Sequence, residues 1–161
     1  MRVIGCDPGK LSGICSFSIE EGEELPSCIE HYELNHLGVG QYFAHHLGTY
    51  QTVVALETFI ITNQTAKNSA APWSLETIGI VRYFCEMAHV PLFMQAPASA
   101  KRLIPDSVLK RAGLYWPGKP HAADSARHAL YLAMTSHNLL QHLLKEDPNG
   151  SDNGEAGQGD R

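Results

Sequence analysis

The first seventeen residues, MRVIGCDPGKLSGICSF, constrain the fold more than any other stretch of this chain. An apolar, partly β-branched run over residues 2–7 predicts a strand that ends on Asp7, and Pro8-Gly9 then turns the chain into a second strand at 12–19. A lone carboxylate at the end of a buried strand is costly, so Asp7 needs a cation, hydrogen-bond donors or a metal ion. The alternative is that Asp7 only caps the Pro-Gly turn, which is a common role for aspartate.

The order of the remaining predicted elements indicates an α/β fold. After the first two strands we expect a strand at 27–34, a weak helix at 38–50, a strand at 52–57, a helix at 72–88, a strand at 91–95, a long connection at 96–119 and a final helix at 121–144. The first three strands form an antiparallel meander, and helical crossovers make the later two strands parallel to the first. The sequence thus predicts a five-stranded mixed sheet with helices on both faces.

The length of 161 residues suits one domain, which we place at residues 1–145. The last sixteen residues, 146–161, hold five acidic residues and one basic residue among Gly, Asn and Ser, and we expect a disordered acidic tail. The sequence lacks an apolar run of the ~18 residues that a membrane span needs, and its N-terminus lacks a signal-peptide pattern. Its four cysteines have neither metal-site nor disulfide-framework spacing. We therefore expect a cytoplasmic protein with reduced thiols and no membrane association.

The net charge of −5 argues at first against a nucleic-acid partner, but the charge is unevenly spread. The tail carries −4, which leaves −1 on the other 145 residues. Residues 98–119 hold one acid, Asp106, and five basic residues: Lys101, Arg102, Lys110, Arg111 and Lys119. Such a segment on a nearly neutral body is compatible with a track for phosphates, and the alternative is a merely solvated surface.

A second acid ends the strand predicted at 52–57. If this strand is the parallel neighbour of the first strand, Glu57 and Asp7 lie side by side at one edge of the sheet. Two adjacent carboxylates repel each other unless a cation lies between them. The final helix opens with HAADSARHALYLA, in which His121 and Asp124 are three residues apart and share one face of the first turn. The alternatives are an acid that suits the helix dipole and a solvated histidine.

Together, Asp7, Glu57, Asp124 and His121 would form an oxygen-rich site with one imidazole. Such a donor set suits Mg²⁺ or Mn²⁺ better than zinc. Two such ions can activate a water molecule and stabilise the leaving oxygen of a phosphoryl displacement. The sequence therefore predicts a site for metal-dependent phosphodiester chemistry.

The helix at 72–88 carries two apolar stripes. One stripe should pack on the sheet. The other either packs on a second copy of the chain or is deeply buried in the same chain, because a helix that is apolar on two sides needs two partners.

The ordered set of DPG after the first strand, Glu57 at the end of the fourth strand and H-x-x-D at the start of the last helix resembles the RuvC Holliday-junction resolvases of the RNase H-like superfamily. The resemblance covers about residues 1–143. It implies a homodimeric endodeoxyribonuclease that hydrolyses two opposed strands of a four-way DNA junction, with two Mg²⁺ ions per site for which Mn²⁺ can substitute. The low basicity and acidic tail resemble a phage-type or divergent member, in the cytoplasm of a bacterium or a phage-infected cell.

The resemblance also implies roles for individual residues. Asp7, Glu57 and Asp124 would bind metal, and His121 would bind metal or contact phosphate. The same resemblance implies that the helix at 72–88 forms the dimer interface.

For DNA contacts, the resemblance points to residues on both sides of the dimer helix. Phe59 would be the aromatic that wedges into the junction, and Lys67-Asn68 would lie in the same loop. Lys101, with Lys110 or Arg111, would lie near the scissile phosphate. The segment around 104–118 departs from the family's usual glycine-rich pattern, which bears on the preferred cleavage sequence.

Three other functions fit parts of the sequence. DPGKLSG resembles the first phosphate loop of the actin and sugar-kinase superfamily, although those proteins need a second domain and a second loop. A non-catalytic junction-binding protein would keep the fold and lose the chemistry. A nuclease for forks or flaps would share the mechanism and differ in substrate.

Overall fold

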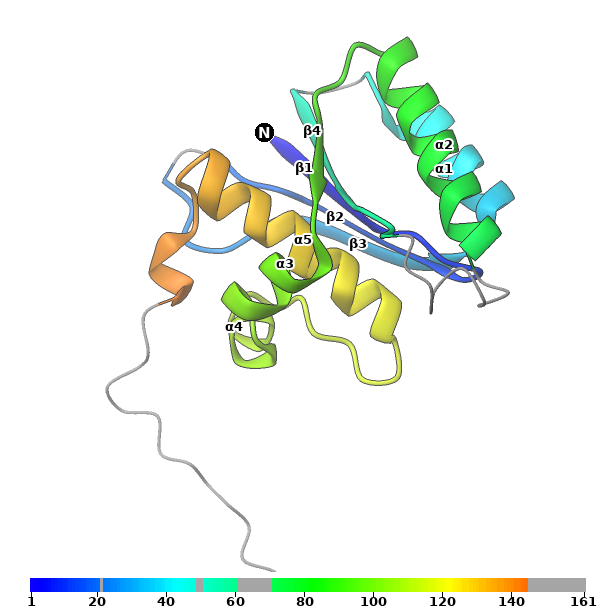
Figure 1. Cartoon of the computed structure of the whole chain (residues 1–161). Helices are drawn as coiled ribbons and strands as arrows, with labels where there is room; N and C mark the ends of the chain where they lie inside the picture. The colour runs from blue at the N-terminus through cyan, green and yellow to red at the C-terminus, as the bar shows by residue number, and fades with distance from the viewer. Residues whose placement is uncertain (21, 49–50, 61–70, 145–161) are drawn as a thin grey trace, which may run out of the picture.

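The computed structural model describes residues 1–20, 22–48, 51–60 and 71–144 (Figure 1). Five strands form one sheet in the order β3-β2-β1-β4-β5. The strands are β1 (Arg2–Asp7), β2 (Ser12–Ser18), β3 (Ser27–Leu34), β4 (Thr52–Glu57) and β5 (Leu92–Gln95). The pairs β1–β2 and β2–β3 are antiparallel, whereas β1–β4 and β4–β5 are parallel. The predicted mixed sheet is confirmed.

Helices cover both faces of this sheet, also as predicted (Figure 1). One face carries α1 (His36–His46) and α2 (Ala71–Met87), and the other carries α5 (Pro120–Ser136) with the short helices α3 (Pro97–Leu103) and α4 (Asp106–Arg111). Among the helices of the described residues, none combines the length and the apolarity that crossing a membrane requires.

The central strands are buried on both faces, so their residues alternate between two cores. Val3 and Val53 pack on the side of α4 and α5, whereas Ile4 and Val54 pack on the side of α1 and α2. A strand covered on both sides is selected for apolar residues at every position. This burial explains why β1 and β4 appear in the sequence as continuous apolar runs that end on an acid.

Two glycines let α5 lie directly on the sheet. A Cβ atom on Gly5 of β1 would come within 2.0 Å of the carbonyl oxygen of Ser125, and one on Gly13 of β2 would come within 1.8 Å of the carbonyl oxygen of His121. Glycine inside a strand often marks such a close approach of another backbone. The start of α5 is thereby held against the ends of β1 and β2.

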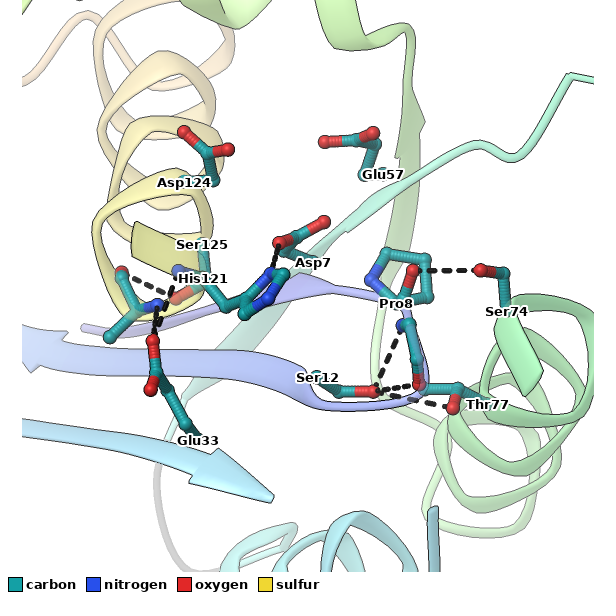
Figure 2. Close-up of polar contacts among 12 residues, drawn as sticks. Asp7, Pro8, Ser12, Glu33, Glu57, Ser74, Thr77, His121, Asp124 and Ser125 are labelled. Carbon is teal, nitrogen blue, oxygen red and sulfur yellow. Dashed lines mark hydrogen bonds and ion pairs between the residues drawn. The ribbon is translucent and has the colours of Figure 1, made fainter. Parts of the chain in front are cut away.

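The Pro-Gly turn after β1 is anchored to α2 (Figure 2). The hydroxyl of Ser74 donates to the carbonyl of Pro8 at 3.0 Å. Ser12 closes the turn from inside, since its hydroxyl oxygen accepts from the N–H of Gly9 at 3.1 Å and lies 3.3 Å from the hydroxyl of Thr77. These bonds fix the backbone directly after Asp7.

The structure corrects the predicted bounds of two helices. The first helix begins at His36, because Asn35 caps it by accepting from the N–H of Gly38 at 2.9 Å, and it ends at His46. The last helix was predicted to reach residue 144, which is wrong. It ends at Ser136, where the N–H of Leu139 donates to the carbonyl of Ala133, and a 3₁₀ turn, η2 (Gln141–Leu144), follows.

Two further expectations concern connecting segments. The stretch at 96–119 is not one long connection, because it contains α3 and α4. The predicted acidic tail at 146–161 lies outside the described residues.

Candidate active site

Two carboxylates lie at the carboxyl ends of adjacent parallel strands. Cys6 of β1 pairs with Leu56 of β4, so the next residues along the two strands, Asp7 and Glu57, are neighbours. The start of α5 brings His121 and Asp124 to the same edge of the sheet (Figure 2). The four residues predicted as ligands therefore border one space. The sequence predicted that Asp124 lies in the first turn of the last helix. Because α5 begins at Pro120, Asp124 instead lies in the second turn.

Asp7 is engaged by the imidazole of His121, with Nδ1 3.0 Å from Oδ2 (Figure 2). Burial raises the pKa of Asp7, and the negative charges of Glu57 and Asp124 raise it further, while the hydrogen bond from His121 opposes this shift. The same hydrogen bond is the main reason why the pKa of His121 is raised. Asp7 is thus close enough to Glu57 and to Asp124 to sense the charge of each.

Glu57 is engaged by a histidine that the sequence analysis did not single out. His128 of α5 places Nε2 2.7 Å from Oε2 of Glu57, and its Nδ1 lies 2.8 Å from Oε1 of Gln95. His128 follows Asp124 by four residues and so shares its helical face, which is the signal that could have found it. Gln95 is the last residue of β5 and pairs with Glu57 in the sheet register.

Asp124 is held by basic residues from two helices. Nζ of Lys101, on α3, lies 3.0 Å from Oδ2 of Asp124, and Arg127 of α5 pairs with the other oxygen. Arg127 also pairs with Asp106 of α4. The hydrogen bond to Asp124 raises the pKa of Lys101. These ion pairs join α3, α4 and α5 beside the candidate site.

The N-terminus of α5 is capped by a side chain from β3 (Figure 2). Oε1 of Glu33 accepts from the backbone N–H of His121 at 3.1 Å and lies 3.5 Å from that of Ala122. An acid at this end of a helix satisfies N–H groups that have no partner in the helix and complements its dipole. Glu33 was not predicted, and its register partner Gly13 shows why it reaches the helix.

The residues expected to contact DNA are distributed more widely. Lys119 lies 3.8 Å from Glu33, close to the start of α5. Lys110 lies over the ring of Tyr115, 5.0 Å from its centroid. Of the others, Arg102 is exposed on α3, Arg111 is half-buried on α4, Phe59 is half-buried after β4, and Lys67 and Asn68 lie outside the described residues. The structure thus brings Lys101 to the predicted ligand Asp124, and Lys119 to Glu33 at the start of α5.

The donor set fits a hard divalent cation by its chemistry, since three carboxylates and one imidazole border one space and two of the carboxylates repel the charge of Asp7. It does not form a finished coordination shell. Within the described part of the chain, no three His, Cys, Asp or Glu side chains are gathered closely enough to hold a metal ion together. Each carboxylate is instead paired with a basic side chain of the protein.

A three-stranded antiparallel meander followed by two parallel strands, with helices on both faces, is the RNase H-like fold. No protein-family model matches the sequence, and a search of curated proteins also finds no match.

Solved structures do match. The structure of Thermus thermophilus RuvC superposes with a TM-score of 0.67 at 20% identity, covering 86% of this chain and 96% of that one. T. thermophilus RuvC in complex with a Holliday junction substrate gives 0.66 at 19% identity, with 87% and 97% covered. The fowlpox virus resolvase in complex with substrate Holliday junction DNA gives 0.49 at 15% identity, with 90% and 100% covered. The chain has the fold of RuvC, as the sequence resemblance predicted.

Proposed function

We propose that this protein is a metal-dependent, structure-selective DNA endonuclease that resolves four-way junctions by paired phosphodiester hydrolysis. The observation that carries the proposal is the convergence of Asp7, Glu57 and Asp124 from β1, β4 and α5 at one edge of a RuvC-like fold. A RuvC protein with this fold is known in complex with a Holliday junction substrate.

Asp7, Glu57 and Asp124 would hold Mg²⁺ or Mn²⁺, with His121 as a further ligand or a phosphate contact, and we infer two ions per site. Bound ions would supply an activated water and stabilisation of the leaving oxygen. The protein's own residues would prepare this site. Glu33, with Gly5 and Gly13 of the sheet, would hold the start of α5 in place. Lys101 would offer a positive charge beside Asp124 for a DNA phosphate.

We also infer that a second copy of the chain packs on α2, so that two sites can act on two opposed strands. Val81 and Cys85 face the core, which accounts for one stripe of this helix. On the other side, Ile80 and Phe84 pack in part on the same core beside α1, whereas Tyr83 and Met87 are 60% and 64% exposed. This side includes an apolar groove of about 510 Å³, lined by His36, Glu76, Gly79, Ile80, Tyr83 and Phe84. A groove of this kind favours the dimer over deep burial of the helix.

The test is a cleavage assay on a labelled four-way junction, a Y-shaped fork and a plain duplex, each incubated with Mg²⁺, Mn²⁺ or EDTA. Paired, ligatable nicks in the junction, absent with EDTA, are the expected result. Equal cutting of the fork would widen the substrate to branched DNA in general. Binding without cutting under either metal would replace the nuclease by a junction-binding protein, and ATP hydrolysis without junction binding would favour the phosphate-loop alternative.

A further inference from the structure

A buried histidine lies behind the candidate site and has no role in the function proposed so far. His128 is 1% exposed and Gln95 is 7% exposed, and both lie at the edge of the sheet where β4 and β5 end. We propose that His128, itself held by Gln95, is a positioning residue that fixes the carboxylate of Glu57 in the orientation needed to bind a divalent cation. This inference rests on the proposed function, since it names a support for the same site.

The hydrogen bonds define what each group does. A carboxylate only accepts, so Nε2 of His128 carries the hydrogen in its 2.7 Å contact with Oε2 of Glu57. The side-chain amide of Gln95 has both an acceptor and a donor, so it can satisfy Nδ1 of His128 in either protonation state of the ring. The imidazole is therefore bonded at both nitrogens and is fixed in rotation.

The backbone around Gln95 is fixed as well. Gln95 pairs with Glu57 in the parallel register, and its carbonyl accepts from the N–H of Thr58 at 2.8 Å and from the hydroxyl of Thr58 at 3.1 Å. Glu57 and Gln95, the partners of the two ring nitrogens of His128, thus come from adjacent strands with a defined spacing. His128 comes from α5, which Gly5 allows to lie directly on the sheet.

This arrangement has a consequence for the free oxygen of Glu57. His128 engages Oε2, so Oε1 is the oxygen available to a cation in the space that Asp7 and Asp124 also border (Figure 2). Groups that orient a ligating side chain typically contribute about 10- to 100-fold to metal affinity. Without His128, the Glu57 carboxylate would be free to turn, and cation affinity should fall by a factor in that range.

Two amide variants separate positioning from general packing. In His128→Gln, the side-chain NH₂ can reach the position of Nε2 and still donate to Glu57. In His128→Asn, the shorter side chain can reach only the position of Nδ1, so the contact with Gln95 remains and the contact with Glu57 is lost. Gln95→Leu tests the second step, because it leaves His128 in place without its holder. Leu132→Met, also buried on α5, is the matched control for core packing.

The measurement is Mn²⁺ binding by electron paramagnetic resonance, in which bound Mn²⁺ no longer contributes to the six-line signal of the free ion. We expect His128→Asn to weaken Mn²⁺ binding by about 10-fold or more. The Mn²⁺ affinity of His128→Gln should be close to that of the wild type. The affinity of Gln95→Leu should lie between those of the two His128 variants, and the affinity of Leu132→Met should equal that of the wild type. Melting temperatures in EDTA show whether each variant is folded.

Equal Mn²⁺ affinity in His128→Asn and the wild type would overturn the inference, as would a His128→Gln variant as weak as His128→Asn. Absence of Mn²⁺ binding by the wild type would overturn it too. Failure of the proposed function looks different. In that case the wild type binds Mn²⁺ and the two amide variants still differ, but the junction is not cut.

Discussion

Lys101 on α3 forms an ion pair with Asp124 on α5, with Nζ 3.0 Å from Oδ2. A basic side chain therefore occupies one oxygen of a candidate metal ligand. A cation bound at Asp124 and the ammonium of Lys101 would compete for that oxygen. Since 54% of the Lys101 side chain is exposed, the ammonium can turn to a DNA phosphate once a cation replaces it.

Lys101→Gln should therefore reduce the salt dependence of junction binding, and should do so more with Ca²⁺ present than with EDTA. One lost phosphate contact lowers the slope of log K against log salt by about 0.9. The measurement is junction affinity over a range of salt concentrations. Lys110→Gln is the comparison for the effect of Ca²⁺, because Lys110 lies over the Tyr115 ring and not beside Asp124, so any change in its slope should be the same with Ca²⁺ and with EDTA. An unchanged slope in Lys101→Gln with Ca²⁺ would remove this lysine from the phosphate track.

Asp7→Asn should abolish metal-dependent cleavage and preserve junction binding. It replaces one charged oxygen ligand by an amide of the same size. Metal ions stabilise developing charge by several kcal/mol, so the single-turnover rate should fall about a thousandfold or more. Glu24→Gln removes an equal charge from the exposed turn between β2 and β3, at the other end of the sheet, and should leave the rate unchanged. Normal cleavage by Asp7→Asn would rule out the site.

The metal-free protein should lose stability as the pH rises, in two steps that both involve Asp7. Burial raises the pKa of Asp7 above its ordinary value of 3.8, so the folded state holds this proton more tightly than the unfolded state. The contribution of the protonated Asp7 carboxyl to the free energy of unfolding is therefore present below about pH 4, and it is lost as the pH passes the raised pKa. The hydrogen bond that His121 makes to Asp7 likewise raises the pKa of His121 above its ordinary value of 6.5, so this second contribution to folding stability is present below about pH 6.5 and is lost as the pH passes the raised pKa.

Melting temperatures in EDTA between pH 4 and pH 8 check this prediction. Asp7→Asn should give a flatter profile than the wild type, because it removes both contributions. His121→Gln should keep the first decline and lose the second. A wild-type profile that rises with pH over the whole range would contradict the assigned directions.

The sheet and the placement of the acids could be predicted from the sequence because both depend on local patterns. β1 and β4 are buried on both faces, so each is a continuous apolar run, and their predicted bounds agree with the structure. Parallel neighbours end at the same edge of a sheet, which brings Asp7 and Glu57 together without knowledge of any distance.

The partners of these acids could not be predicted in the same way. The partners lie near these acids only in the folded chain, and they are His128, Glu33 and Arg127. The positions of their side chains depend on how α5 lies on the sheet. A histidine inside an apolar helix resembles a core residue until the neighbouring strand end is known. The space that the four predicted residues share was predictable, whereas the hydrogen bonds and ion pairs that hold each carboxylate were not.

The end of the last helix was missed for a local reason. Beyond Ser136, apolar residues continue at a spacing compatible with a longer helix, at Leu139, Leu140 and Leu144. Asn138 and Leu140 instead adopt positive φ angles of 53° and 57°, which no helical residue can have. Asparagine tolerates this left-handed region better than most residues, so Asn138 is where the sequence permits the helix to stop.

Gly13→Ala should destabilise the protein, because its Cβ would lie 1.8 Å from the carbonyl oxygen of His121 and α5 would have to move away. Overpacking of this kind typically costs about 1–3 kcal/mol. Urea unfolding measures the loss. Gly40→Ala, in α1, is the matched control. Its Cβ would make an ordinary contact at 3.6 Å with Ile80, and alanine favours a helix over glycine by about 1 kcal/mol. The two variants should therefore change stability in opposite directions.

Tyr83→Asp should separate the inferred dimer into monomers, because it places a charge in the exposed apolar groove of α2. Loss of a buried interface aromatic commonly costs about 2 kcal/mol or more, which raises the dimer dissociation constant about 30-fold. Sedimentation velocity over a range of concentrations measures this change. Leu25→Asp is the control, since Leu25 is 51% exposed in the turn before β3 and should leave the dimer intact. In the cleavage assay, Tyr83→Asp should shift the products from paired cuts to single nicks. A variant that remains dimeric would show that the second copy packs on a surface other than α2.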